Sequence, residues 1–190
     1  MKKRYSNGFT LTELLVTIAI FLLITGAVYS GFLLSQRAYR ASELASELSQ
    51  NGRVVLERIT REIRQAKEIA TELAEEEPAE TVSPADGIIF EDGHGTTTYY
   101  YIHYYKEDSS LNREILGYYF SGNPGVYVPW NAVPPGGQTL ETEILESPKT
   151  VGEYITGIKF WGTKVVSISL VLEKKQKTVE LSTKIFGRNL

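Results

Sequence analysis

The fold is decided by residues 14–34, LLVTIAIFLLITGAVYSGFLL, a run of 21 residues without a charge. At about 1.5 Å per helical residue, this run matches the roughly 30 Å hydrocarbon core of a bilayer. The basic cluster Lys2-Lys3-Arg4 precedes it, and such residues are enriched on the cytoplasmic side of membrane helices. We therefore expect one membrane-spanning helix, with the N-terminus in the cytoplasm and the C-terminal part outside.

A secretory signal peptide is the competing interpretation, because it also combines a basic start with an apolar stretch. The apolar run is long for a signal peptide, and no A-x-A-like site follows it. The small residue that could precede a cut, Gly8, lies before the apolar run. These three features favour a retained membrane helix.

The segment Gly8-Phe9-Thr10-Leu11-Thr12-Glu13 leads directly into the apolar run. A carboxylate that reaches the hydrocarbon is costly, so such residues tend to have a partner and a function. The alternative is that Glu13 lies at the helix N-terminus near the headgroups, where the helix dipole favours an acid, and has no other function. If a protease cuts after Gly8, the absence of a Cβ at this residue lets the enzyme bind the backbone closely.

Residues 8–16, GFTLTELLV, closely resemble the class III leader of type IV prepilins and type II secretion pseudopilins. The resemblance covers about the first 30 residues strongly. It implies that a prepilin peptidase cuts after Gly8 and that Phe9 becomes the N-methylated first residue. It also implies that Glu13 pairs with the free amine of a neighbouring subunit's first residue and sets the axial register during assembly.

Composition limits the remaining possibilities. The chain has 190 residues, a formal charge of -3 and no Cys, which excludes disulfides, thiolate metal sites and a Cys nucleophile. An acidic balance argues against a nucleic-acid footprint, although not against a local basic patch. We expect a leader over 1–8, a membrane and filament-core helix over 9–34, an amphipathic continuation over 35–75 and a β-rich domain over 76–190.

The amphipathic continuation shows apolar residues three or four apart, interrupted at Asn51-Gly52, which is a candidate kink. A proline and a polar run predict the end of the helix near residues 75–78. Glu57 and Arg61 are expected to form an i,i+4 pair on a charged face, which is either solvated or turned to a partner. The apolar positions are Leu44, Leu48, Val55, Ile59, Ile63, Ala66 and Leu73.

From residue 87 onward, short alternating segments separated by turn residues predict an antiparallel sheet. The last two segments alternate most clearly and are joined by a turn over 174–177, so one face is expected to be covered by the amphipathic helix. A loop rich in Gly and Pro is predicted over 121–138. The expected strands are 87–91, 96–106, 113–120, 139–145, 154–161, 166–172 and 179–185, with the first three forming a meander with turns over 92–95 and 107–112.

Three further stretches resemble the J-type minor pseudopilins and W-type minor pilins. They are residues 53–66, the element Leu111-Asn112-Arg113, and the ending 181–189, which closes on Arg188-Asn189. The resemblance implies the α+β pilin fold, in which a long N-terminal helix packs on an antiparallel sheet. It also implies a minor subunit, and Glu13 disfavours the tip-most K-type, which usually lacks that acid.

No residue pattern indicates an enzyme, a cofactor or a metal site. His94 and His103 are the two histidines, and a calcium site would need acidic turn residues such as Glu91, Asp92 and Asp108. The Tyr-rich stretch 99–105 could stack nucleic-acid bases, but aromatic residues are also natural strand formers, and the structural interpretation is favoured.

The sequence therefore predicts a structural subunit in the inner membrane with its C-terminal domain periplasmic or extracellular. It is a minor pseudopilin or minor pilin that helps to initiate or cap a type II secretion pseudopilus or a type IV pilus. The alternative is a competence-type minor pilin that binds DNA or a secreted substrate. The expected partners are the prepilin peptidase, other minor subunits, the major pilin and the inner-membrane assembly platform.

Overall fold

The computed structural model describes residues 10–78, 87–94 and 98–187. The chain divides into two compact units, residues 1–43 and residues 44–190, and each is described by itself. The helix α1 (Leu11–Gln65) supplies residues to both units. Together with the strands described below, it gives the α+β arrangement of a long N-terminal helix with antiparallel β-sheets, which agrees with the expected pilin fold.

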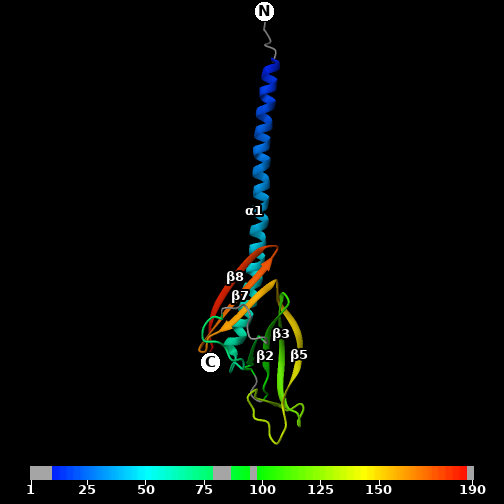
Figure 1. The fold of residues 1–190 in the computed structure, drawn as a ribbon, viewed down its shortest axis with the longest axis vertical. Helices are drawn as coiled ribbons and strands as arrows, with labels where there is room; N and C mark the ends of the chain where they lie inside the picture. The colour runs from blue at the N-terminus through cyan, green and yellow to red at the C-terminus, as the bar shows by residue number, and fades with distance from the viewer. Residues whose placement is uncertain (1–9, 79–86, 95–97, 188–190) are drawn as a thin grey trace, which may run out of the picture. The chain divides into compact units, whose positions relative to one another are not determined.

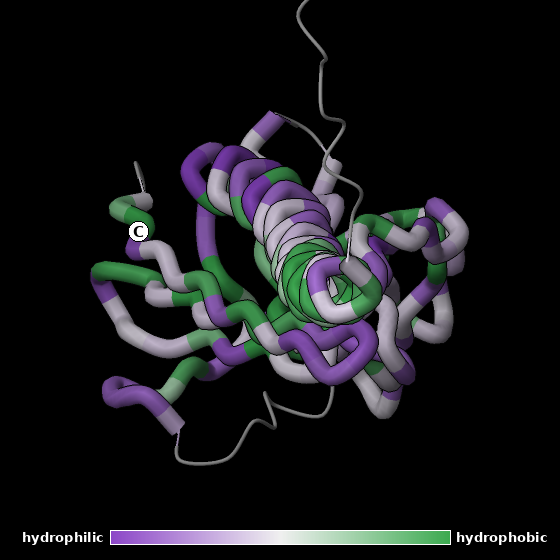
Figure 2. The backbone as a smooth tube through the Cα atoms, turned by 90° about the horizontal axis from the view of Figure 1, so that it is seen from above, coloured by the Kyte–Doolittle hydropathy of each residue, from purple (hydrophilic) through white to green (hydrophobic). Residues whose placement is uncertain are grey.

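In the first unit, every described residue from 10 to 43 is exposed. Leu15, Phe21 and Leu23 are more than half exposed, although each side chain is strongly apolar. By length and composition, α1 is able to cross a membrane. The hydropathy colouring of Figure 2 shows this apolar character on the turns of α1 nearest the viewer. Because burying such side chains in hydrocarbon is favourable, this part of α1 is suited to lipid or to a bundle of similar helices.

In the second unit, the described residues form two antiparallel sheets (Figure 1). One sheet has the order β1-β2-β3-β4, and β5 pairs with the opposite edge of β3. The other sheet has the order β6-β7-β8. The strands are β1 Ile88–Glu91, β2 Tyr101–Glu107, β3 Ser110–Phe120, β4 Tyr127–Val128, β5 Leu140–Glu153, β6 Ile155–Trp161, β7 Val165–Lys174 and β8 Lys177–Phe186.

The predicted pairing of the last two strands is confirmed. Leu170 lies opposite Leu181 and Val166 opposite Ile185, so the two apolar faces coincide. The turn residues Lys175 and Gln176 both have positive φ, 48° and 64°. A two-residue turn with positive φ at both positions has the twist that antiparallel hairpins require.

The C-terminal part of α1 covers this sheet, and Gly52 marks the closest approach. A Cβ on Gly52 would lie 2.5 Å from Leu181 Cδ1 and 2.8 Å from Leu172 Cδ1. The helix continues without interruption through Asn51-Gly52. Gly52, which was predicted to mark a kink, instead lets the helix approach the sheet closely. The helix residues buried in this unit are Leu48, Gly52, Val55, Leu56, Ile59 and Ile63.

The predicted end of the helix was wrong, because α1 ends at Gln65, ten residues before residue 75. The following residues run along the edge of β1, where Ala70 N donates to Ile89 O at 2.9 Å and Glu91 N donates to Glu68 O at 2.9 Å. Ile69 forms an isolated bridge with Phe90. The spacing of Ala66, Ile69 and Leu73 fits a helix, but all three side chains also pack on the core from an extended segment. The backbone of this segment forms its hydrogen bonds with β1.

Five predictions about the strands also needed correction. The sequence suggested one sheet, whereas the described strands form two, and β4 lies inside the predicted loop. β2 begins at Tyr101, and the turn after it is shorter than 107–112, since β3 already begins at Ser110. β5 continues to Glu153 through Pro148. Proline is tolerated there because β5 pairs on one edge, and register shifts interrupt that pairing.

Candidate functional site: the N-terminal assembly segment

The predicted cleavage and methylation residues, Gly8 and Phe9, lie outside the residues that the structure describes. Glu13, the third residue of the predicted site, lies in the first turn of α1. The other residues considered for chemistry lie in the second unit, apart from the N-terminal segment.

Glu13 forms a reciprocal capping box with Thr10. The backbone N–H of Thr10 donates to Glu13 Oε2 at 3.0 Å, and the Thr10 hydroxyl donates to the same oxygen at 2.8 Å. In return, Glu13 N donates to Thr10 Oγ1 at 3.3 Å. Such a box satisfies backbone donors that the first helical turn leaves free. The carboxylate is therefore held at the start of the apolar helix by a neighbour on its own chain.

The sequence analysis missed the role of Thr10. The signal was present, since Thr10 and Glu13 are spaced as Thr-x-x-Glu directly before an apolar run. Resemblance to prepilin leaders directed attention to Glu13 alone. The two hydrogen bonds from Thr10 both go to Glu13 Oε2, so the capping box uses one carboxylate oxygen.

The Thr and Ser side chains of the apolar stretch are satisfied within the helix. Thr17 donates to Glu13 O at 2.7 Å, Thr25 to Phe21 O at 2.7 Å and Ser30 to Gly26 O at 2.8 Å. A hydroxyl that bonds to a carbonyl one turn back leaves no polar atom in need of water. These residues therefore do not oppose insertion of α1 into a bilayer.

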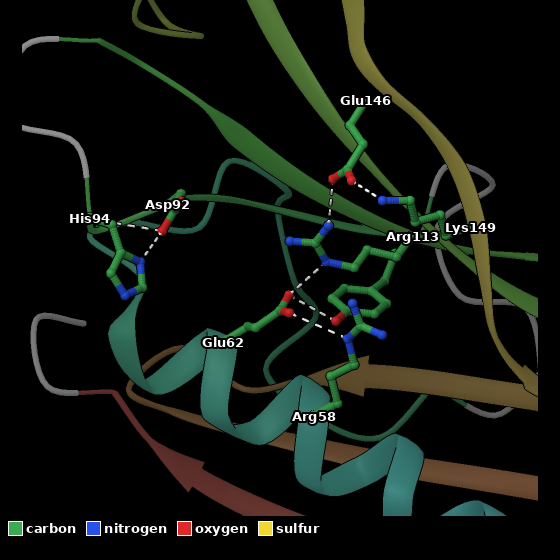
Figure 3. Close-up of polar contacts among 8 residues, drawn as sticks. Arg58, Glu62, Asp92, His94, Arg113, Glu146 and Lys149 are labelled. Atoms are coloured by element: carbon green, nitrogen blue, oxygen red, sulfur yellow. Dashed lines mark hydrogen bonds and ion pairs between the residues drawn. The ribbon is translucent and has the colours of Figure 1, made fainter.

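The second unit contains a charged network centred on Glu62 of α1 (Figure 3). Arg113 Nε donates to Glu62 Oε2 at 3.0 Å, and the Tyr104 hydroxyl donates to the same oxygen at 2.8 Å. Arg58 Nε lies 3.5 Å from Glu62 Oε1. Arg113 also donates to Glu146 at 3.1 Å, and Lys149 pairs with Glu146. One carboxylate thus joins α1 to β2 and β3, and Arg113 extends the connection to β5.

The network is arranged to hold its charges near neutral pH. Burial, together with the charge of Glu62, raises the pKa of Tyr104, so this phenol stays protonated. The hydrogen bond from Lys149 holds the pKa of Glu146 below its usual range, and Arg113 adds to the effect. The charged face expected on this part of the helix is not wholly solvated, since the side chain of Glu62 is only 18% exposed. The expected pair of Glu57 with Arg61 is absent among the described residues, and Arg58 pairs with Glu62 instead.

The histidines and acidic turn residues do not converge on one point. His94 Nδ1 lies 2.5 Å from Asp92, Glu91 pairs with Lys67 at 2.9 Å, and His103 pairs with Glu114 at 2.8 Å. Within the described ranges, no group of three or more His, Asp and Glu side chains could hold a metal ion. The calcium alternative therefore gains no support from these residues.

The Tyr-rich strand has the structural role that the sequence analysis favoured. Tyr101 and Tyr104 are fully buried. The Tyr101 hydroxyl accepts a hydrogen bond from Trp130 N at 3.1 Å, and burial raises its pKa to about 12. Rings that are closed in the core cannot stack on nucleic-acid bases.

The element Leu111-Asn112-Arg113, quoted above for its resemblance to minor subunits, lies at the centre of the second unit. Leu111 and Asn112 are buried, and Arg113 is the cation of the network. Residues 188 and 189 of the C-terminal motif lie outside the described residues. The element therefore has a clear structural role, whatever the class of subunit.

Residues 3–29 match the family described as the prokaryotic N-terminal methylation motif. No curated protein and no solved structure matches the chain. The match covers the leader and most of the apolar run, and it indicates a structural subunit that is a substrate of the prepilin peptidase. Together with the exposed apolar helix, this type IV prepilin-like motif supports the pilin and pseudopilin family for this chain, anchored in the inner membrane by a single span.

Proposed function

We propose that the chain is a minor pseudopilin or minor pilin, which helps to initiate or cap a type II secretion pseudopilus or a type IV pilus. The observation that carries the proposal is the methylation motif over residues 3–29, which includes the start of an exposed apolar helix with Glu13 in its first turn. Support for the minor class is the resemblance of residues 53–66 and 111–113 to J-type and W-type subunits.

In this proposal, the prepilin peptidase cuts between Gly8 and Phe9 on the cytoplasmic side, and Phe9 is then methylated. Residues 9–34 cross the inner membrane and later enter the filament core, while the C-terminal domain lies outside the cytoplasm. The partners are the assembly platform, the major pilin and other minor subunits. The direction of insertion follows from the basic cluster Lys2-Lys3-Arg4.

Glu13 sets the register of the incoming subunit by pairing with the amine of a neighbour's first residue. The Thr10 capping box presents the carboxylate at the start of the helix, where such an amine would arrive. An acid held near hydrocarbon gains most from a cationic partner, because unpaired charge is costly there. The amine of each correctly placed neighbour therefore supplies the positive charge that pairs with the Glu13 carboxylate.

The experiment compares Glu13→Ala with Glu13→Gln in cells that assemble the filament. Glutamine still serves as the third residue of a capping box but carries no charge. Both variants should insert and be cleaved, as seen by the mobility shift of the processed chain, and both should be missing from sheared filaments. Normal incorporation of Glu13→Gln would overturn the charge-pairing role, and lack of cleavage of the unaltered chain would overturn the prepilin assignment.

A further inference from the structure

The part of α1 within the second unit presents an exposed stripe that is rich in arginine. Arg53, Arg61 and Arg64 are exposed, and their spacing places them on one side of the helix with Val54 and Glu57. Three arginines and one glutamate give this stripe a formal charge of +2. We call these five residues the arginine stripe.

The three arginines have no ion-pair partner among the described residues, in contrast to the neighbouring Arg58. Val54 is 60% exposed. The hollow of about 290 Å³ that adjoins the stripe is lined by carboxylates, Glu62 and Asp92, as well as by Arg61 and Arg113, so it favours neither sign of charge. An exposed apolar residue among unpaired cations favours a partner that carries carboxylates.

The same unit carries a surface of opposite charge at the outer edge of β5. Glu141 and Glu143 lie on one face of this strand, and Ile144, which follows Glu143 and lies on the other face, is 57% exposed. Tyr119 and Tyr127 donate to the two carboxylates at 2.9 Å and 3.0 Å. We call Glu141, Glu143 and Ile144 the acidic edge.

The acidic edge is free for contact and partly fixed in place. β5 pairs with β3 along one side, and no described strand pairs with its other side. Hydrogen bonds from the tyrosines hold the carboxylates in defined positions, which lowers the entropy lost when a cation binds. The formal charge of -2 equals in size the +2 of the arginine stripe.

We propose that the arginine stripe of one subunit binds the acidic edge of a second copy of this chain. The two surfaces are different parts of one molecule, so the contact is heterologous and can be repeated along a filament. Exposed ion pairs are individually weak. Two copies anchored in one membrane meet at high effective concentration, so weak contacts are sufficient. The inference goes beyond the proposed function, because a subunit that initiates or caps a filament does not need a second copy.

The test uses crosslinking of the full chain, which has no native cysteine. Two differently tagged copies, one with Val54→Cys and one with Ile144→Cys, are produced together in a membrane without the other assembly proteins. A short bismaleimide should join the two tags. The pair Val54→Cys with Val133→Cys is the matched control, since Val133 is 86% exposed but lies outside the acidic edge.

Charge reversal decides whether the contact is the one proposed. Arg61→Glu with Arg64→Glu in the first copy should lower the crosslink yield roughly tenfold, and Glu141→Arg with Glu143→Arg in the second copy should restore it. Raising the salt from about 0.05 M to about 0.5 M should also lower the yield. Thermal unfolding of each variant in detergent checks that it is folded.

Crosslinking of the control pair at the same yield, or no rescue by the compensating reversal, would overturn the inference. Crosslinking of Val54→Cys to itself alone would also overturn it, because that contact is symmetric. Because crosslinking requires neither cleavage nor filament growth, absence of the crosslink would not count against the proposed role of Glu13. Likewise, normal incorporation of Glu13→Gln into filaments would not count against the contact between two copies.

Discussion

Arg113 of β3 reaches Glu62 of α1 with its Nε 3.0 Å from the carboxylate, and this contact ties the helix to the larger sheet. Both side chains are mostly buried, at 12% and 18% exposed. When one partner of such a pair is removed, the other is left with a charge that is poorly solvated. The pair therefore fixes the position of α1 relative to β3, and its loss should lower the stability of the whole domain.

Substitution Glu62→Gln should destabilise the domain by about 2 kcal/mol, because Arg113 and Tyr104 lose their charged acceptor. Urea unfolding of the chain without residues 1–34 measures this change. Arg113→Met should have a similar effect, and the double variant should be less unstable than the sum of the two, since neither charge is then left alone. The control Glu57→Gln alters an exposed residue of the same helix and should change stability by less than about 0.5 kcal/mol. Additive effects of the two substitutions would show that the pair is not coupled.

Substitution Gly52→Val should destabilise the domain by about 2 kcal/mol, because its side chain would overlap the methyl groups of Leu181 and Leu172. The additional variant Leu181→Ala should recover part of the loss, since it makes room for the new side chain. Leu181→Ala alone should be destabilising, so recovery in the pair would identify the close approach as the cause. Thermal unfolding followed by circular dichroism compares the four proteins. If Gly52→Val unfolded at the original temperature, the helix would not lie against β7 and β8 as described.

The protonation of His94 offers a test of the turn between β1 and β2. The hydrogen bond that the His94 ring donates to the Asp92 carboxylate, together with the charge of that carboxylate, raises the pKa of His94 above its ordinary value of 6.5. Because the folded-state pKa is the higher one, the pair stabilises the fold fully below pH 6.5, and this contribution is lost as the pH rises through the folded-state pKa. An NMR titration of the ring protons should show the raised pKa, and Asp92→Asn should return it toward 6.5. An identical pKa in both proteins would mean that the two side chains do not interact in solution.

Sequence patterns predicted the hairpin of β7 and β8 well, because its alternation has period two and both strands bury the same face. They failed at the end of α1, since the spacing of Ala66, Ile69 and Leu73 suits both a helix and an extended segment on the core. The choice between the two depends on backbone groups of β1, which are distant in sequence. The pair of Glu62 with Arg113 joins residues 51 positions apart, and no local pattern marks such a pair.

The capping box makes a prediction about assembly that separates geometry from charge. Thr10→Val removes the hydroxyl that donates to Glu13, while the Glu13 charge and the Thr10 backbone N–H remain. Loss of a side-chain cap weakens the start of a helix, so the carboxylate should be held less well. Incorporation into filaments should fall roughly fivefold, which is less than the complete loss expected for Glu13→Gln. Thr25→Val is the matched control, because the Thr25 hydroxyl donates to Phe21 O at 2.7 Å, away from the capping box. Circular dichroism of peptides of residues 9–34 in micelles should show reduced helicity for Thr10→Val and unchanged helicity for Thr25→Val. Equal incorporation of Thr10→Val and the unaltered chain would mean that assembly depends on the charge of Glu13 and not on how Thr10 positions it.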